Sequence, residues 1–430
     1  PVERRKNFSS MNIRILYLFS RSKSSELLPN DGRLCYTFCV KKLFSTLCAA
    51  LAAVVCFTGC AASGYTVFEP TAVFADDILF SAKMIGGRAR YAYERMAERI
   101  AEIDSQVSPS RADSDINALN AAEVGTEVEV GKYCYELFLL GRDYYILTDG
   151  AFNIAAAPLS ELWHVDASSI TELRPGPGDA PVTVELPEPQ AVEAMLSGCD
   201  PTLVDAEERG GRYYLKKTAD VRLDLGGIAK GYAVDRCVDI LREYDIKSAL
   251  IDISGNAYFY GDNSAGGRAD SWKVGVLSPR PRGGEVLAAR GYAAAFSVGG
   301  GAAAATSGDY MRYYVSDNGG GMYVPHIIKA DGVPVGVEYA DGQWRNSAEW
   351  VISATVIADG GAASDALSTA VCALGMEKGA RLLQKVGCKG LIFTEKRFTI
   401  IGGVELYKPD VYDGYRGYER VDFDMAEDAA

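Results

Sequence analysis

The chain has 430 residues, of which 48% are hydrophobic, and a formal net charge of −13. So acidic a chain lacks the basic surface that nonspecific nucleic-acid binding requires, which excludes that class of function. The apolar content is enough for a packed core, and the length suits one large domain or two modest ones.

The first predicted element in chain order is an export signal. Lys41 and Lys42 precede a short apolar run, residues 43–58, and a glycine and Cys60 follow it. The Phe-Thr-Gly-Cys ending resembles a bacterial lipobox, in which Cys60 is acylated, although leucine is usual where phenylalanine stands. We therefore expect a lipoprotein signal peptide over residues 40–60. It would export the protein and anchor it by lipid on the outer side of the cytoplasmic membrane; a plain signal peptide cut nearby is the alternative.

The segments around this signal are assigned from it. Residues 1–39 do not fit ahead of an export signal, and a valine codon at position 40 can serve as a bacterial start, so we expect residues 1–39 to be a gene-model extension. Residues 61–72 are predicted to form a tether and residues 73–415 the folded domain. Residues 416–430 are predicted to be a loose acidic tail.

Apolar spacing then predicts strands with interspersed helices through the domain. Strands are expected at 78–85, 213–225 (a hairpin-like pair), 249–260 with a break at 254–256, 272–277, 292–298, 351–357 and 390–394. Helices are expected at 89–103, 130–147, 187–196, 228–241 and 364–374. Without a strict βαβ repeat, this order predicts an α+β fold: a mixed β-sheet core with flanking helices in a single large domain, a smaller added subdomain being the alternative.

Cysteine and histidine usage excludes two kinds of site. Five of the ten cysteines lie in or before the leader. The other five are scattered without a Cys-x-x-Cys pair, which indicates buried thiols and neither a zinc site nor a disulfide scaffold. Only two histidines are present, His164 and His326, so a multi-histidine metal cage is excluded.

The most informative stretch reads as a strand, a glycine pair and a helix. Apolar residues alternate from Val221 to Leu225, and Gly226-Gly227 predict a tight turn that approaches a ligand closely. The following helix would present its N–H groups to an anion, with Lys230 in the first turn and Asp224 on the strand side. This arrangement indicates phosphate binding, with a metal as a further option; an ordinary turn with a solvated lysine is an equal alternative.

Four further residues carry candidate chemistry. Asp365 and Thr369 are four residues apart in a predicted helix, so they share one face and could supply hard oxygen ligands to Mg²⁺. On the residues alone, a capping aspartate and a threonine bonded to its own helix are favoured instead. Ser307 lies in an Ala-Thr-Ser-Gly-Asp-Tyr run that could hold a ligand or form a tight turn. His326 follows Pro325 at an expected strand edge.

Taken together, these motifs resemble the ApbE family, the FAD:protein FMN transferases. The likeness covers most of residues 75–395 in order. It includes Leu-Asp-Leu-Gly-Gly-Ile-Ala-Lys-Gly-Tyr at 223–232, Ala-Thr-Ser-Gly-Asp-Tyr at 305–310 and Asp-Ala-Leu-Ser-Thr at 365–369. The resemblance implies an exported enzyme that binds FAD and Mg²⁺, breaks the pyrophosphate, moves FMN onto a Thr or Ser hydroxyl of an exported acceptor protein, and releases AMP.

The resemblance also implies roles for single residues. The carbonyl of Gly227 and the side chains of Asp365 and Thr369 match the metal ligands. Either Asp365 or His326 could take the proton of the acceptor hydroxyl. The residues that match FAD contacts are Ala151, Phe152, Asn153, Asp224, Lys230, Ser307, His326 and Ile327.

Three positions depart from the family pattern on the FAD side. Asp76 stands where Met-Gly-Thr or Met-Asp-Thr is frequent, Ser110 where an aromatic residue is frequent, and Asn153 where aspartate is usual. Three rival functions remain open at this stage. They are an FAD pyrophosphatase that uses water as acceptor, a non-catalytic flavin-binding lipoprotein, and a flavoprotein that carries its own covalent FMN.

Overall fold

The computed structural model describes residues 67–73, 78–173, 181–263, 270–280, 291–317, 321–406 and 418–423. The predicted signal peptide with Cys60 lies outside these residues, as does Asp76. In the described part of the chain, no helix is both long enough and apolar enough to cross a membrane.

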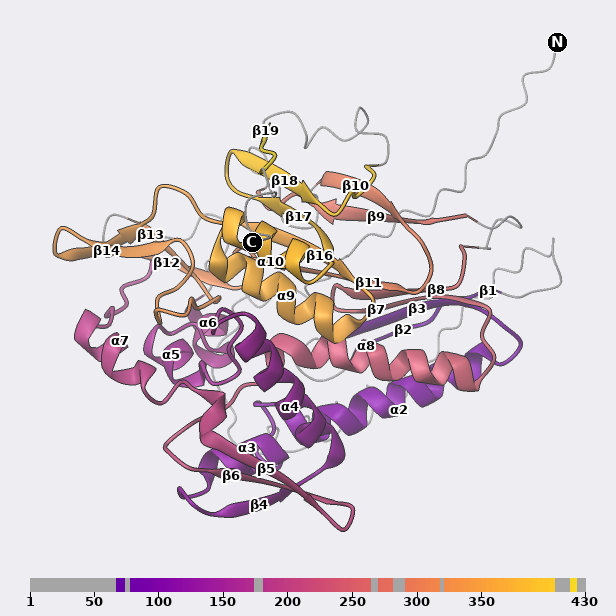
Figure 1. Ribbon diagram of the computed structural model, residues 1–430, viewed down its shortest axis with the longest axis horizontal. Coiled ribbons are helices and arrows are strands. Elements are labelled where there is room, and N and C mark those ends of the chain that lie inside the picture. Colours follow the sequence, from indigo (N-terminus) through magenta and orange to yellow (C-terminus); the bar gives the residue numbers. More distant parts are fainter. Residues whose placement is uncertain are drawn as a thin grey trace, which may run out of the picture.

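A ten-stranded sheet forms the centre of the molecule (Figure 1). Its strands run in the order β1-β3-β7-β8-β11-β16-β17-β18-β19, β2 also pairs with β3, and every pair is antiparallel except β18 with β19. The predicted mixed sheet with flanking helices is confirmed. The strands are β1 (Val67–Phe68), β2 (Thr71–Val73), β3 (Leu79–Ile85), β7 (Ser248–Ile253), β8 (Asn256–Tyr260), β11 (Ala302–Gly308), β16 (Ser353–Ala358), β17 (Lys389–Phe393), β18 (Arg397–Ile401) and β19 (Glu419–Arg420).

Helices cover one face of this sheet (Figure 1). They are α2 (Ala89–Val107), α8 (Gly226–Glu243), α9 (Gly361–Leu374) and α10 (Met376–Lys385). Strand β11 contributes small residues to this face, Ala303 and Ala305, both buried. Because these side chains are short, α9 packs directly against the middle of the sheet, which brings the predicted ligand Asp365 to it.

The opposite face of the sheet is apolar and is covered by a separate hairpin of β9 (Trp272–Leu277) and β10 (Tyr292–Val298). Alternation along a strand decides which core each side chain joins: on β8, Tyr258 belongs to the helix-covered core and Phe259 to the hairpin-covered core. Both hairpin strands have the bounds that the sequence predicts.

Smaller elements surround this centre. A three-stranded sheet combines β4 (Glu127–Val130), β6 (Arg212–Lys217) and β5 (Val204–Arg209), and two hairpins pair β12 (Tyr313–Ser316) with β13 (Met322–Pro325) and β14 (Val337–Ala340) with β15 (Gln343–Asn346). The remaining helices are α3 (Asp115–Ala121), α4 (Lys132–Leu147), α5 (Ala157–Leu162), α6 (Ala167–Leu173), α7 (Pro189–Leu196) and the 3₁₀ turn η2 (Pro201–Leu203). A third apolar core, which includes Trp163, Tyr314 and Trp344, joins several of them.

The prediction of a strand directly before the glycine pair is wrong. Val221, Leu223 and Leu225 are buried in alternation, but the segment pairs with no strand. Instead the side chain of Asn120 satisfies Leu223: the Leu223 N–H donates to Oδ1 and Nδ2 donates to the Leu223 carbonyl, both at 2.8 Å. An asparagine amide thus replaces a neighbouring strand, which the alternation of apolar residues could not reveal.

Other boundaries also differ from the predictions. Helix α8 begins at Gly226, so the glycine pair forms its first turn and does not precede it. Helix α4 begins only at Lys132 because Val130 ends β4. Part of the predicted tether, β1 and β2, pairs with β3, and Glu419–Arg420 of the predicted tail pairs with β18.

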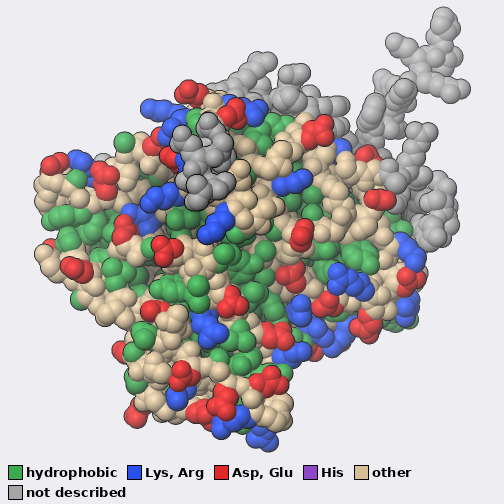
Figure 2. Space-filling view, viewed as in Figure 1, with side chains coloured by type: hydrophobic (Ala, Val, Ile, Leu, Met, Phe, Trp, Pro, Cys, Tyr) green, Lys and Arg blue, Asp and Glu red, His purple; other side chains and the backbone are tan. Residues whose placement is uncertain are grey.

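The cysteines behave as the sequence predicts, since the five in the described residues are free. Four are buried, and burial raises the pKa of the Cys134, Cys237 and Cys372 thiols far above the usual range. Figure 2 shows acidic and basic side chains intermixed over one face of the molecule, without a continuous field of either sign.

Candidate active site

Two glycines allow α8 and α9 to touch. A β-carbon on Gly231 would lie 2.2 Å from the carbonyl oxygen of Gly361 and 2.7 Å from Cβ of Asp365. A β-carbon on Gly361 would lie 2.3 Å from the carbonyl oxygen of Gly231. Only glycine fits at both positions, and the close crossing places the Asp365 side chain against the backbone of α8.

Asp235 fixes the start of α9 from the side of α8. Its carboxylate accepts hydrogen bonds from the amides of Gly361, at 2.6 Å, and Ala362, at 2.9 Å. The first N–H groups of a helix have no partner within the helix, so this carboxylate caps α9 across the helix–helix contact. The orientation of the helix that carries Asp365 and Thr369 is therefore set by hydrogen bonds as well as by packing.

Asp365 is a buried carboxylate, 5% exposed. Its Oδ2 accepts a hydrogen bond from the amide of Gly231 at 3.0 Å, and the Lys230 ammonium lies 3.8 Å away. Burial raises the pKa of Asp365, while Lys230, the Gly231 amide and a hydrogen bond from Asn256 oppose that rise. Gly231 follows Gly227 by one helical turn, so in a regular helix its amide donates to the Gly227 carbonyl. In this structure the Gly231 amide donates to Asp365.

A chain of hydroxyl groups leads from Asp365 to Thr369. Ser368 Oγ donates to the main-chain carbonyl of Asp365 at 2.9 Å, and Ser307 Oγ lies 2.7 Å from Ser368 Oγ and 3.0 Å from Thr369 Oγ1. Thr369 Oγ1 also donates to the main-chain carbonyl of Asp365 at 3.3 Å, the bond to its own helix that the sequence offered as an alternative, so Ser307 can donate to either neighbouring hydroxyl. Thr369 Oγ1 then has lone pairs left to accept or to bind a cation.

These donors fit a hard divalent cation. They are a carboxylate, a threonine hydroxyl and a glycine carbonyl, with the amide oxygen of Asn256 nearby; this buried Oδ1 has no hydrogen-bond partner in the described structure. Oxygen ligands of this kind suit Mg²⁺. Across the described ranges, no three His, Cys, Asp or Glu side chains converge as a transition-metal site would require.

His326 is held in one tautomer. Its Nδ1 lies 3.1 Å from the carbonyl oxygen of Arg312, which can only accept, so Nδ1 carries the proton and Nε2 keeps its lone pair. Burial lowers the pKa of His326 to about 3, and the positive charges of Arg312 and Lys230 act in the same direction. At neutral pH the imidazole is uncharged and can take a proton through Nε2.

The predicted flavin contacts Ala151 and Phe152 lie beside the start of α8. A β-carbon on Gly227 would lie 3.2 Å from the Phe152 ring, so that ring packs on the glycine backbone. Thr148 orders the turn, because its Oγ1 accepts from the Phe152 amide at 2.9 Å and its carbonyl accepts from the Ala151 amide at 3.2 Å. Residues 152 and 227, far apart in sequence, are thus in contact.

Two other predicted FAD contacts, Asn153 and Asp224, use their side-chain polar atoms in hydrogen bonds within the protein. Asn153 Nδ2 donates to the Cys199 carbonyl at 2.7 Å, and its Oδ1 accepts from the Ala155 amide at 2.8 Å. Asp224 Oδ1 accepts from the Gly226 amide at 2.8 Å, so that N–H of the helix start is not free for an anion. Ile327 is buried in the main core.

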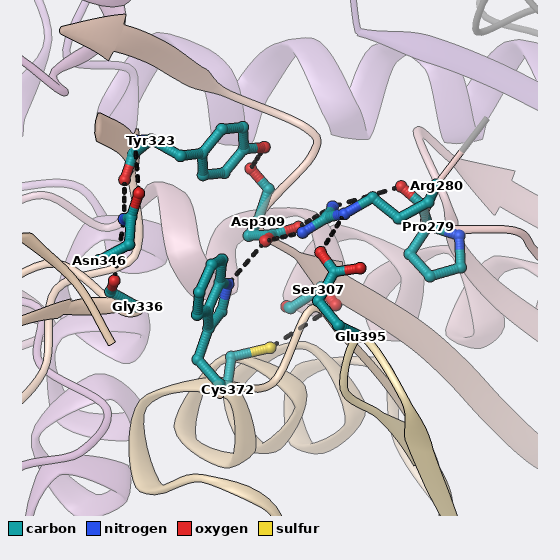
Figure 3. A network of polar contacts seen from close by, with 10 residues as sticks. Pro279, Arg280, Ser307, Asp309, Tyr323, Gly336, Asn346, Cys372 and Glu395 are labelled. Carbon is teal, nitrogen blue, oxygen red and sulfur yellow. Dashed lines mark hydrogen bonds and ion pairs between the residues drawn. The ribbon is translucent and has the colours of Figure 1, made fainter. Parts of the chain in front are cut away.

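A second buried carboxylate, Asp309, lies beyond the end of β11 (Figure 3). Arg280 donates to both of its oxygens, at 2.7 and 2.6 Å, and also to Glu395 at 2.6 Å. Trp350 Nε1 donates to Asp309 Oδ2 at 2.8 Å. Figure 3 shows the Arg280 guanidinium between Asp309 and Glu395. Because Asp309 follows Ser307 by two residues, this cluster fixes the end of the strand that carries the Thr369 partner.

Comparison with known proteins agrees with this geometry. Residues 75–392 match the sequence profile of the ApbE family. The chain belongs to the ApbE family. The FAD:protein FMN transferase of Klebsiella pneumoniae (strain 342) is 26% identical over 330 residues, covering 76% of this chain and 89% of the relative. That of Treponema pallidum (strain Nichols) is 29% identical over 328 residues, covering 73% and 80%.

Solved ApbE structures share the fold. The ApbE protein of Thermotoga maritima superposes with a TM-score of 0.61 at 25% identity, over 80% of this chain and 98% of that one. The flavinyl transferase ApbE of Pseudomonas stutzeri gives a TM-score of 0.60 at 23% identity, over 80% and 96%. The resemblance drawn from the motifs is confirmed for most of the chain.

The structure also explains one departure of this ApbE-family chain from the family pattern. Asn153 donates through Nδ2 to the Cys199 carbonyl, which an ionised aspartate cannot do. Ser110, which stands where an aromatic residue is frequent, is exposed.

Sequence reasoning missed four residues that build the ApbE site. The resemblance also runs through residues 113–120, 223–235 and 254–256, which contain Asn120, Asp235 and Asn256, so an unassigned polar residue in each segment was the available signal. Arg280 lies in no such segment. It meets Asp309 only because β9 and β11 end near each other, which a linear pattern does not express.

Proposed function

We propose that this protein is an FAD:protein FMN transferase that depends on a divalent cation, Mg²⁺, and modifies a Thr or Ser hydroxyl of an exported acceptor protein. The observation that carries the proposal is the buried Asp365 carboxylate, which meets Lys230 and the Gly231 amide at the crossing of α8 and α9. Membership of a family whose relatives bear this activity supports it.

The proposed reaction is a phosphoryl transfer. The acceptor oxygen forms a bond to the phosphorus of the FMN half of FAD, the bond from that phosphorus to the bridging oxygen breaks, and AMP leaves with the bridging oxygen. Such transfers depend on positioning and charge neutralisation more than on covalent catalysis. A divalent cation, when bound by Asp365, Thr369 and the Gly227 carbonyl, supplies charge neutralisation at the diphosphate.

The chain's own residues supply the other parts. Lys230 carries positive charge beside Asp365, where it can bind a phosphate oxygen. His326 is the base that we favour, because it is neutral and its Nε2 is the free acceptor. Asp365 is the weaker candidate, since its Oδ2 is engaged by the Gly231 amide and faces Lys230.

One assay separates the rival functions. The protein is incubated with FAD, Mg²⁺ and a candidate exported acceptor, then analysed for a fluorescent band and for AMP. A labelled acceptor with AMP supports the transferase, whereas AMP and FMN without label indicate a pyrophosphatase. Bound FAD with neither product indicates a flavin-binding protein. Flavin that stays on the chain after denaturation indicates a covalent flavoprotein.

We also propose that Cys60 carries the lipid that anchors the protein outside the cytoplasmic membrane. The lipobox-like ending at Cys60 and the preceding apolar run support this. Metabolic labelling with a fatty acid should mark the wild type and fail to mark Cys60→Ser, and label that persists in the variant would contradict the anchor.

A further inference from the structure

Asn256 holds a buried polar atom that the fold leaves unsatisfied. The residue begins β8 and is 4% exposed. Its Oδ1 has no hydrogen-bond partner among the described residues. A buried acceptor without a partner destabilises the folded protein, so such an atom needs a physical explanation.

The sheet register places Asn256 on the helix-covered face beside the site. Asn256 is opposite Ala305 of β11, so Ser307, two residues further along, lies on the same face and diagonally across. Tyr258, two residues after Asn256 on β8, joins the core under the helices, which identifies that face independently. Asn256 and Ser307 therefore both face the helix that carries Asp365 and Thr369.

The two ends of the Asn256 amide have different partners. Asp365 as a carboxylate can only accept, so its hydrogen bond with Asn256 comes from Nδ2, and this bond helps to keep Asp365 charged. The unsatisfied oxygen belongs to the same planar amide, whose nitrogen donates to the Asp365 carboxylate. An asparagine carbonyl is a hard oxygen ligand of the kind that Mg²⁺ and Ca²⁺ accept.

We propose that Asn256 Oδ1 is a further ligand of the divalent cation, added to Asp365, Thr369 and the Gly227 carbonyl. The inference rests on the cation site of the proposed function. A neutral asparagine ligand would also have an effect on the charge of the site that an aspartate would not have. With Asn256 neutral, Asp365 is the one charged ligand in this set, so a bound divalent cation keeps net positive charge with which to attract the diphosphate of its substrate.

Mn²⁺ binding to the full-length protein, followed by electron paramagnetic resonance, tests this ligand. We expect Asn256→Ala to weaken Mn²⁺ binding by about 10-fold, as loss of a supporting oxygen does at metal sites. Asn256→Asp should bind Mn²⁺ at least as tightly as the wild type but gain less affinity when ADP is added as a diphosphate probe. The matched control is Asn346→Ala, because in the described structure Asn346 forms hydrogen bonds to the backbone of Tyr323 and Gly336, away from the cation site.

A direct readout accompanies the affinities. With asparagine labelled by ¹³C at the side-chain carbonyl, the wild type should show a ¹³C coupling to Mn²⁺ that Asn256→Ala abolishes. Mn²⁺ bound to the wild type without that coupling, or with unchanged affinity in Asn256→Ala, would overturn the inference alone. A wild type that binds no Mn²⁺ with or without ADP would overturn the proposed cation-dependent function as well.

Discussion

Asp309 and Asp365 are both buried carboxylates near the same end of β11, yet their surroundings differ. Asp309 accepts two bonds from Arg280 and one from Trp350, so a full cation and an indole N–H satisfy its side chain. Asp365 accepts one main-chain bond at 3.0 Å and a bond from Asn256, whose own oxygen is unsatisfied, and the Lys230 ammonium is 3.8 Å away.

The difference is between a carboxylate whose charge the fold compensates fully and one whose charge it compensates only in part. A buried charge is tolerated when an opposite charge with good geometry compensates it, as at Asp309. At Asp365 the negative charge is compensated only in part. The neighbouring oxygen atoms are hard ligands, and a bound divalent cation would complete the compensation. Perturbed carboxylates of this kind concentrate at functional sites.

The largest effect is expected for Asp365→Ala. Removing the one carboxylate of the proposed cation site should lower FMN transfer by about 1000-fold or more, equivalent to about 4 kcal/mol of lost transition-state stabilisation. The fluorescent-acceptor assay at saturating FAD measures it. Asp239→Ala, at an exposed residue of α8 that pairs with Arg242, is the matched control and should transfer normally. Normal transfer by Asp365→Ala would remove that residue from the mechanism.

The second prediction concerns stability at the other carboxylate. Asp309→Ala leaves the Arg280 cation without its bidentate partner, and breaking a buried pair in this way costs about 3–5 kcal/mol. Urea denaturation measures the loss. Glu338→Ala, which breaks the exposed pair with Arg345, should cost less than about 1 kcal/mol. Equal losses in the two variants would show that the Asp309 cluster is no firmer than a surface pair.

A smaller effect is expected at the hydroxyl chain. Ser307→Ala removes the hydroxyl that lies 3.0 Å from Thr369 Oγ1 and should weaken Mn²⁺ binding by about 10-fold, because hydrogen-bond partners orient metal ligands. Calorimetric titration measures this. Thr306→Ala is the control, since Thr306 bonds to Thr355 and faces the hairpin-covered side of the sheet. Unchanged affinity in Ser307→Ala would leave the hydroxyl chain without influence on the cation.

The smallest effect is a pH dependence. Burial lowers the pKa of His326 to about 3 from an ordinary 6.5, so the unfolded chain binds a proton there that the folded chain does not. Stability from this group is therefore complete above about pH 6.5 and falls as the pH drops towards 3. Relative to His326→Gln, the wild type should lose unfolding free energy only in that window. A constant difference would show that the pKa of His326 is not lowered in the folded protein.

The comparison with His326→Gln is needed because Asp252 titrates in the same range. Burial raises the pKa of the Asp252 carboxyl to about 6, so its contribution to stability changes with pH in the opposite sense. The two effects offset each other in the wild type alone. They separate when only His326 is replaced.

Much of the fold could be predicted from the sequence because period and composition are local properties. Strands β9 and β10, and the helix that carries Asp365 and Thr369, are where apolar spacing places them. The stretch before Gly226 could not be assigned correctly, because its backbone partner is the side chain of Asn120, 103 positions away. Long-range side-chain bonds have no local signature.

The candidate site, too, could be predicted from the sequence only in part. The resemblance named Asp365, Thr369 and Lys230, and the structure brings Lys230 to Asp365 and Ser307 to Thr369. The roles of Asp235 and Gly361 depend on how two helices cross, which residue types alone do not determine. Asn153 and Asp224 were predicted to contact FAD, and the bonds that occupy them are to neighbouring backbone, formed only once the turns fold.

We propose that the Asp365 carboxylate holds a divalent cation. Asp365→Asn tests it most directly, because the amide keeps the size of the side chain and an oxygen for the Gly231 amide while removing the charge. Mn²⁺ titration followed by electron paramagnetic resonance should show one bound ion in the wild type and at least 100-fold weaker binding, on the order of 3 kcal/mol, in the variant. Equal Mn²⁺ affinity in the two proteins would contradict the claim.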